Sequence, residues 1–179
     1  MTEVSINKQA RLSEHFTLAE MCKTSAKTPD GNIPSHVHIE NLKRLCGWLE
    51  ELRRRVNTSP SPSQGGECLP DSDARRPSSP LGRSGEVPII INSGYRSEAV
   101  NKAVGGVKGS NHLTGCAADI RVAGIEQLVR YATILLDISD LNNEDFDELL
   151  LERSPKGTFW LHFAVRPSGN RRRVRLIQT

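Results

Sequence analysis

The stretch Ser110–Asp119 reads SNHLTGCAAD and leads from a loop into a predicted strand at about 116–122. It contains two residues of metal-binding type, His112 and Asp119, seven positions apart. Gly115 allows a sharp backbone turn between them. The small alanines before Asp119 let the strand approach its neighbours closely. We therefore expect the side chains of His112 and Asp119 to face the same pocket.

A third candidate ligand, His162, lies in the apolar run FWLHFAV at 159–165. Side chains alternate along a strand, so His162 should face away from Leu161 and Phe163. Two imidazoles and one carboxylate leave the fourth position of tetrahedral zinc open, which is typical of catalytic zinc. The spacing alone leaves two interpretations open: one zinc site, or three separate polar residues that are satisfied near the sheet end.

The hydrophobic periodicity predicts helices in the first part of the chain and mainly strands in the second. Helices are expected after Thr17, at about 37–56, at 98–104 after Ser97, and at 125–138 with Leu128, Val129, Ala132, Leu135 and Leu136 inward. Strands are expected at 88–92, 116–122, 147–152, 159–165 and 172–178, the last at an edge. This order predicts an α+β fold with a small antiparallel sheet flanked by helices.

The composition is that of a soluble globular protein, with 36% hydrophobic and 25% charged residues. At 179 residues, one domain over residues 1–179 is expected. Residues 57–87 are rich in Ser, Pro and Gly and poor in large apolar residues, which predicts a disordered insertion. The four cysteines lack CxxC spacing, which argues against a cysteine zinc module.

The charge pattern bears on partners and location. The net charge is +3, and the basic run RRRVR at 171–175 is expected to be a solvated strand; contact with an anionic polymer is the alternative. No nucleic-acid partner is expected. No run of about 18 apolar residues is present, so no membrane insertion is expected. No secretory signal is visible, which predicts a protein that is cytoplasmic until release. We expect a monomer.

The run at 110–119 resembles the S-x-H-x-x-G-x-A-x-D signature of the zinc D-Ala-D-Ala peptidases, which share their fold with hedgehog signalling domains. SGYRS at 93–97 and WLHFAV at 160–165 match the other two landmarks of that family, in the same order. The stretches FTLAEM, ENLKRL and INSGYRS also resemble a phage or prophage branch. The resemblance implies a hedgehog/DD-peptidase-like fold with zinc as cofactor. It implies these zinc ligands: His112, Asp119 and His162.

The resemblance also implies roles for residues around the metal. Arg96 matches a residue that faces the substrate pocket, where it could hold a carboxylate or polarise a peptide carbonyl; a structural ion pair is the alternative. Ser110 matches the signature serine, which binds substrate or caps the loop. Cys116 occupies a variable position of the signature and is interpreted as a packing residue.

The general base is less directly indicated. Many relatives carry Glu or Asp three residues before the last histidine, but this chain has Phe159 there. Glu152 resembles the glutamate that closes the preceding strand in hedgehog-type relatives, and a hairpin would bring it to His162. Glu152 is therefore expected as the base. Asp147 and Glu148 are expected to be too distant or solvated.

The implied function is that of a zinc metallopeptidase, a hydrolase of a D-alanine-containing bond in peptidoglycan stem peptides. Either carboxypeptidase or endopeptidase (endolysin) action would fit. Zinc would lower the pKa of water, Glu152 would accept its proton, and Arg96 would help to stabilise the oxyanion. The main alternative is a non-catalytic, zinc-containing module that binds peptidoglycan or peptide. A weaker alternative is a dipeptidase or amidase that acts on a small peptide.

Overall fold

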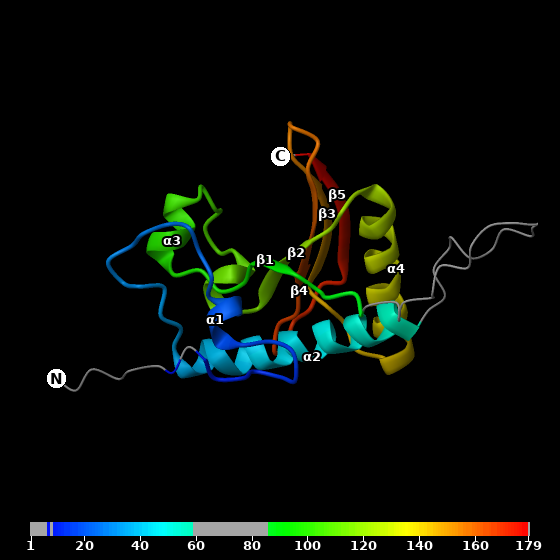
Figure 1. Ribbon diagram of the computed structural model, residues 1–179, viewed down its shortest axis with the longest axis horizontal. Helices are drawn as coiled ribbons and strands as arrows, with labels where there is room; N and C mark the ends of the chain where they lie inside the picture. Colours follow the sequence, from blue (N-terminus) through cyan, green and yellow to red (C-terminus); the bar gives the residue numbers. More distant parts are fainter. Residues whose placement is uncertain (1–6, 8, 59–85, 179) are drawn as a thin grey trace, which may run out of the picture.

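Two long helices, several short ones and a five-stranded sheet lie within the part of the chain that the computed structural model describes, residues 7, 9–58 and 86–178 (Figure 1). The elements are α1 (Leu18–Met21), α2 (His36–Thr58), β1 (Ile91–Ser93), α3 (Glu98–Ala103), the 3₁₀ helix η2 (Asn111–Thr114), β2 (Ala117–Arg121), α4 (Ile125–Asn142), β3 (Glu148–Arg153), β4 (Phe159–Ala164) and β5 (Arg173–Gln178). The arrangement confirms the expected α+β class.

The strands lie in the order β1-β2-β4-β3-β5, with β4 at the centre. Neighbouring strands are antiparallel except β3 and β5, which are parallel, so the sheet is mixed and the expectation of a wholly antiparallel sheet was wrong for the last strand. The reason is geometric. β4 ends with Ala164 beside Glu148, the first residue of β3, and a short connection from that end places Arg173 beside Glu148 too. β5 must then run in the direction of β3.

One face of the sheet forms the hydrophobic core with α2 and α4. Phe163 on β4 is fully buried and packs with Trp48 of α2, with ring centroids 5.3 Å apart. The buried stripe of α2 follows the expected three- and four-residue spacing. Burying one such leucine side chain stabilises the fold by about 1.5–3 kcal/mol. The fully buried leucines of this stripe are Leu42, Leu45, Leu49 and Leu52.

The opposite face of the sheet carries polar side chains. Asp119 on β2 is the cross-strand partner of His162 on β4, which in turn partners Leu150 on β3. Glu148 and Glu152 lie two positions either side of Leu150, so alternation places both carboxylates on the same face as His162. The sheet register thus gathers titratable side chains from three strands over a small area.

The long helices differ from expectation at their ends. α4 extends to Asn142, beyond the expected end at 138. The next residue, Asn143, caps the helix in the left-handed conformation with φ 52°. Val129 was expected to face inward, but it is 49% exposed, whereas Tyr131 on the same helix is buried. No described helix has the length and apolar character needed to cross a membrane.

The expected insertion at 57–87 falls mainly on residues 59–85, which lie outside the described residues. Its two ends are described. α2 continues through Thr58, and the side-chain amide of Asn57 makes two hydrogen bonds with the backbone of Val87, at 2.7 and 3.2 Å. The last turn of α2 is therefore tied directly to the segment that leads into β1.

Candidate metal centre and active site

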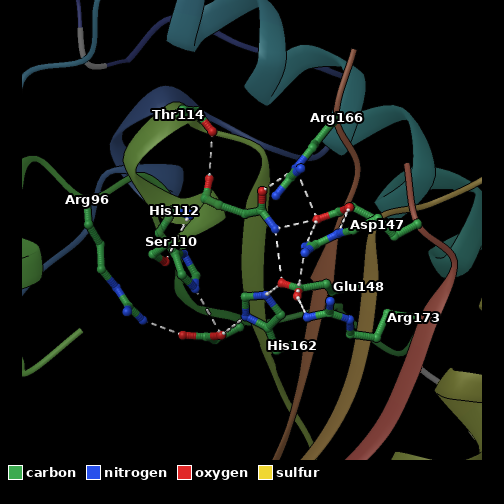
Figure 2. Close-up of polar contacts among 12 residues, drawn as sticks. Arg96, Ser110, His112, Thr114, Asp147, Glu148, His162, Arg166 and Arg173 are labelled. Atoms are coloured by element: carbon green, nitrogen blue, oxygen red, sulfur yellow. Dashed lines mark hydrogen bonds and ion pairs between the residues drawn. The ribbon is translucent and has the colours of Figure 1, made fainter. Parts of the chain in front are cut away.

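His112, Asp119 and His162 come together on the polar face of the sheet, as the sequence predicted. Figure 2 shows the two histidines side by side. Each of the three residues offers one ligand atom, and these atoms all lie within 4.8 Å of one another. The Oδ1 atom of Asp119 is 3.2 Å from Nε2 of His112 and 2.9 Å from Nδ1 of His162. All three residues are buried. This group of two imidazoles and one carboxylate could hold a metal ion.

The backbone around His112 fixes the orientation of its ring. Nδ1 lies 2.6 Å from the carbonyl oxygen of Gly94, which can only accept, so Nδ1 carries the proton and donates it. A side chain at Gly94 would place Cβ 2.3 Å from the oxygen of Met21, so this close approach requires glycine. Gly115 has φ +71° and closes η2, which confirms the sharp turn expected after His112.

The protonation of His112 fits a cation at this site. Burial lowers the pKa of His112, which favours a neutral ring. A neutral ring with its proton on Nδ1 presents the lone pair of Nε2 to Oδ1 of Asp119, so two acceptors face each other. A bound metal ion would satisfy both. A carbonyl partner on the second ring nitrogen is also the arrangement that usually orients metal-binding histidines.

Asp119 is anionic and held on both oxygens. Burial alone would raise the pKa of Asp119, but its neighbours His112 and His162 outweigh burial and hold the pKa well below its usual range. Its Oδ2 accepts a 2.5 Å hydrogen bond from Nη2 of Arg96, which also donates from Nε to Ser93 at 2.8 Å. Arg96 therefore lines the pocket, as predicted, and also makes the ion pair that was its alternative role.

Glu148 lies next to the third ligand, which corrects the expectation that it would be distant or solvated. Its Oε2 is 3.8 Å from Nε2 of His162, a buried nitrogen that has no hydrogen-bond partner within the described residues. Three donors hold the Glu148 carboxylate in place. They are Asn111 at 3.0 Å, Arg171 at 2.9 Å and Arg173 at 3.2 Å.

Asp147 was also expected to be distant or solvated, but its side chain is 0% exposed. Arg171 donates two hydrogen bonds of 2.7 Å to it, one to each oxygen. Asn111 donates at 2.7 Å, and Nε of Arg166 lies 3.0 Å away. Burial would raise the pKa of Asp147, but these donors hold it below its usual range. Asp147 thus ties β3 to the loop that carries His112.

Replacement of Asp147 by alanine is expected to lower the free energy of unfolding by about 1–3 kcal/mol, because Asn111, Arg166 and Arg171 lose a shared, fully buried acceptor. Denaturant unfolding of the purified variant measures the change. Asp140→Ala is the matched control, since Asp140 also pairs with an arginine, Arg172, but is 63% exposed. Asp140→Ala should lower the free energy of unfolding by less than Asp147→Ala does. Equal losses in the two variants would contradict a structural role for the buried carboxylate.

Glu152, the expected base, lines the same pocket on the same face of the sheet as His162. Burial raises its pKa, against opposing effects of His162, Arg96 and a hydrogen bond from the Trp160 side chain. Within the part of the chain that the structure describes, no arginine bonds to Glu152, whereas Arg171 and Arg173 bond to Glu148. The two glutamates of β3 therefore differ in their hydrogen-bond partners.

The pocket around these groups has a volume of about 580 Å³. Ser110 lines it, and its hydroxyl accepts from the backbone N–H of His112 at 3.3 Å, so the serine caps η2 and also faces the pocket. Cys116 is buried, its Sγ lies 3.8 Å from the Thr114 carbonyl, and it is not part of the metal group, as expected of a packing residue.

The basic run at 171–175 was expected to be solvated, but its first three arginines pair with carboxylates. Arg171 and Arg173 reach the residues beside the metal group, as Figure 2 shows for Arg173 and Glu148. The sequence signal for these ion pairs was a pair of oppositely charged segments: acidic residues at the start of β3, and basic residues just before and at the start of β5. Only parallel pairing of these strands brings the two together.

Residues 80–137 match the sequence profile of the family described as Peptidase M15. The matched segment includes Arg96, Ser110, His112 and Asp119, whereas His162 and Glu152 lie beyond it. No curated protein matches the chain. The chain is therefore similar to the Peptidase M15 family over residues 80–137, and its His-Asp-His group could hold the metal ion of a metallopeptidase.

Proposed function

We propose that the protein is a zinc peptidase that hydrolyses a D-alanine-containing peptide bond in peptidoglycan stem peptides. The observation that carries the proposal is the convergence of His112, Asp119 and His162 in a pocket that also contains Glu152. The family match supports the metallopeptidase part of this statement. The choice of substrate rests on the resemblance of 110–119 to the D-Ala-D-Ala peptidase signature.

The three ligands would leave one coordination position of zinc open to the pocket. When bound, zinc supplies a Lewis acid that polarises a carbonyl and lowers the pKa of a water molecule to about 7. The protein's own residues prepare the site. Gly94 holds the ring of His112, and Arg96 holds Oδ2 of Asp119.

Glu152 is the proposed general base. It would accept a proton from the attacking water and return it to the leaving amine. Its raised pKa suits both steps, because the ideal base has a pKa close to the working pH. Glu148 is less suited, since Arg171, Arg173 and Asn111 all donate to its carboxylate oxygens, which are then less available to accept a proton from water.

Arg96 is proposed to polarise the scissile carbonyl. Its Nε and Nη2 atoms are used by Ser93 and Asp119, and neither bond uses Nη1. One donor on a guanidinium that is already fixed can stabilise a developing oxyanion without reorganisation. Ser110 would place its hydroxyl toward substrate at the pocket wall.

The proposal extends to the setting in which the protein works. The stretches FTLAEM and ENLKRL resemble a phage or prophage branch, so a lysis enzyme fits best. It would act as a monomer on the cell wall after release from the cytoplasm. Neither nucleic acid nor membrane insertion has a place in this function.

The decisive experiment is mass spectrometry of products released from purified sacculi by zinc-loaded protein, beside a chelated control. A new stem-peptide fragment that disappears with chelator and returns with zinc is the expected result, and its mass identifies the bond cut. Absence of products from protein shown to hold zinc would contradict the proposal and favour the binding module. Cleavage of free D-Ala-D-Ala with intact sacculi untouched would favour a dipeptidase.

A further inference from the structure

The cluster beside the metal group contains more positive than negative charge. Three arginines, Arg166, Arg171 and Arg173, pair with two carboxylates, Asp147 and Glu148. With both carboxylates ionised, the cluster carries one net positive charge. Arg166 and Arg171 of this cluster line the pocket, so an anionic group on a ligand could pair with the extra arginine.

Arg166 lines the pocket and has donors to spare, whereas Arg173, which donates to Glu148 through Nη1, does not line the pocket. The Nε atom of Arg166 donates to Oδ1 of Asn111 at 2.8 Å and lies 3.0 Å from Asp147. Neither Nη1 nor Nη2 of Arg166 makes a hydrogen bond to the residues that the structure describes. Its side chain is 33% exposed and lines the pocket. The guanidinium is thus held at one nitrogen while the terminal pair stays available.

The other arginines that line the pocket are more heavily engaged. Arg96 uses two nitrogens on Ser93 and Asp119. Arg171 uses Nε and Nη2 on Asp147 and Glu148. A fork of two parallel N–H groups, the geometry that a carboxylate prefers, is therefore offered by Arg166.

The position of Arg166 suits contact with an extended peptide. Besides the pocket that contains the metal group, it lines a second pocket of about 340 Å³, together with Leu113, Cys116 and Pro167. Both pockets also share Ser110 and Asn111. In Figure 2, Arg166 and Arg96 lie on opposite sides of the two histidines. A peptide whose scissile bond lies at the metal would therefore have room to extend past Arg166.

We propose that Arg166 binds a carboxylate group of the substrate through its two terminal nitrogens, and so sets the preference for acidic over amidated peptides. The inference rests on the proposed peptidase function and deepens it. Two sources of the carboxylate share this chemistry: the α-carboxylate at the end of the peptide, and a carboxylate of a residue inside it.

The test uses zinc-loaded protein and three synthetic stem peptides that end in D-Ala-D-Ala. One has all carboxylates free, one has an amidated C-terminus, and one has its internal carboxylate amidated. Wild-type protein should show a kcat/KM about 10- to 100-fold higher for the free acid than for one of the amides, through KM. The amidated peptide that shows the lower kcat/KM identifies which carboxylate Arg166 binds.

Arg166→Gln should lower this ratio towards one, and Arg166→Lys should give an intermediate ratio, because lysine keeps the charge but loses the fork. Arg175→Gln is the matched control: Arg175 is exposed on β5 and does not line the pocket, so its ratio should equal that of the wild type. A ratio compares two substrates on one protein, so partial unfolding of a variant cannot produce its loss.

Equal kcat/KM for the acid and both amides in the wild type would overturn the inference while leaving the peptidase function intact. An unchanged ratio in Arg166→Gln would overturn it as well. If the wild type cleaves none of the peptides, the proposed function fails, and the same peptides are titrated by calorimetry. If the wild type then binds the acid more tightly than the amides, and Arg166→Gln loses this difference, the result would support the subsite. Equal binding of the acid and the amides would overturn it.

Discussion

Replacement of Glu152 by glutamine is expected to lower kcat by about 10²- to 10⁴-fold, the usual contribution of a general base. Glutamine keeps the size of the side chain but cannot accept the proton of the attacking water. Zinc should remain bound, because Glu152 is not one of the three grouped ligand residues. Stem-peptide hydrolysis and zinc content of the same preparation measure the two effects separately.

Glu126→Gln provides the control for this change, since Glu126 is exposed in the first turn of α4. Its kcat should equal that of the wild type. A near-normal kcat in Glu152→Gln would remove Glu152 from the role of base. Glu148→Gln would then be the next variant to measure, because Oε2 of Glu148 lies 3.8 Å from Nε2 of His162.

The pH dependence of the wild type checks the same assignment. The base must be ionised, and burial raises the pKa of Glu152 above its usual 4.5. Activity should therefore be lost as the pH falls through this raised pKa, at a higher pH than an ordinary glutamate would give. The acid limb of the kcat/KM profile measures it, and Glu152→Gln should lack that limb.

Asp119→Ala is expected to abolish metal binding and hydrolysis together. Asp119 is the candidate ligand between the two histidines, and its Oδ1 lies within 3.2 Å of a ring nitrogen of each. Loss of a direct ligand should weaken zinc affinity by more than the about 10- to 100-fold that loss of an outer partner costs. Arg96 would also lose its carboxylate partner. Competition with a chromophoric chelator measures the affinity.

Asp137→Ala is a suitable control, because Asp137 is exposed on α4 and lies outside the metal group. It should keep both zinc and hydrolysis. If Asp119→Ala bound zinc with wild-type affinity, the His-Asp-His assignment would be wrong. Circular dichroism of both variants distinguishes loss of the site from loss of the fold.

The sequence alone predicted the parts of this protein that depend on local chemistry. Periodicity located α2 and α4, and side-chain alternation in the last hairpin turned His162 away from Leu161 and Phe163. The resemblance of 110–119 to a peptidase signature indicated the metal group that the structure brings together. The role of Glu152 as base stays a prediction, supported by its place in the pocket and its raised pKa.

Only the tertiary structure decided what surrounds the metal group. Asp147 and Glu148 looked like solvated residues at a strand start, yet they contact Arg171 and Arg173, more than 20 positions away. These contacts exist because β5 runs parallel to β3 and places Arg173 beside Glu148. Local patterns report on burial within one element; charge pairs between distant strands depend on sheet order and register, which the chain adopts only when the whole core has formed.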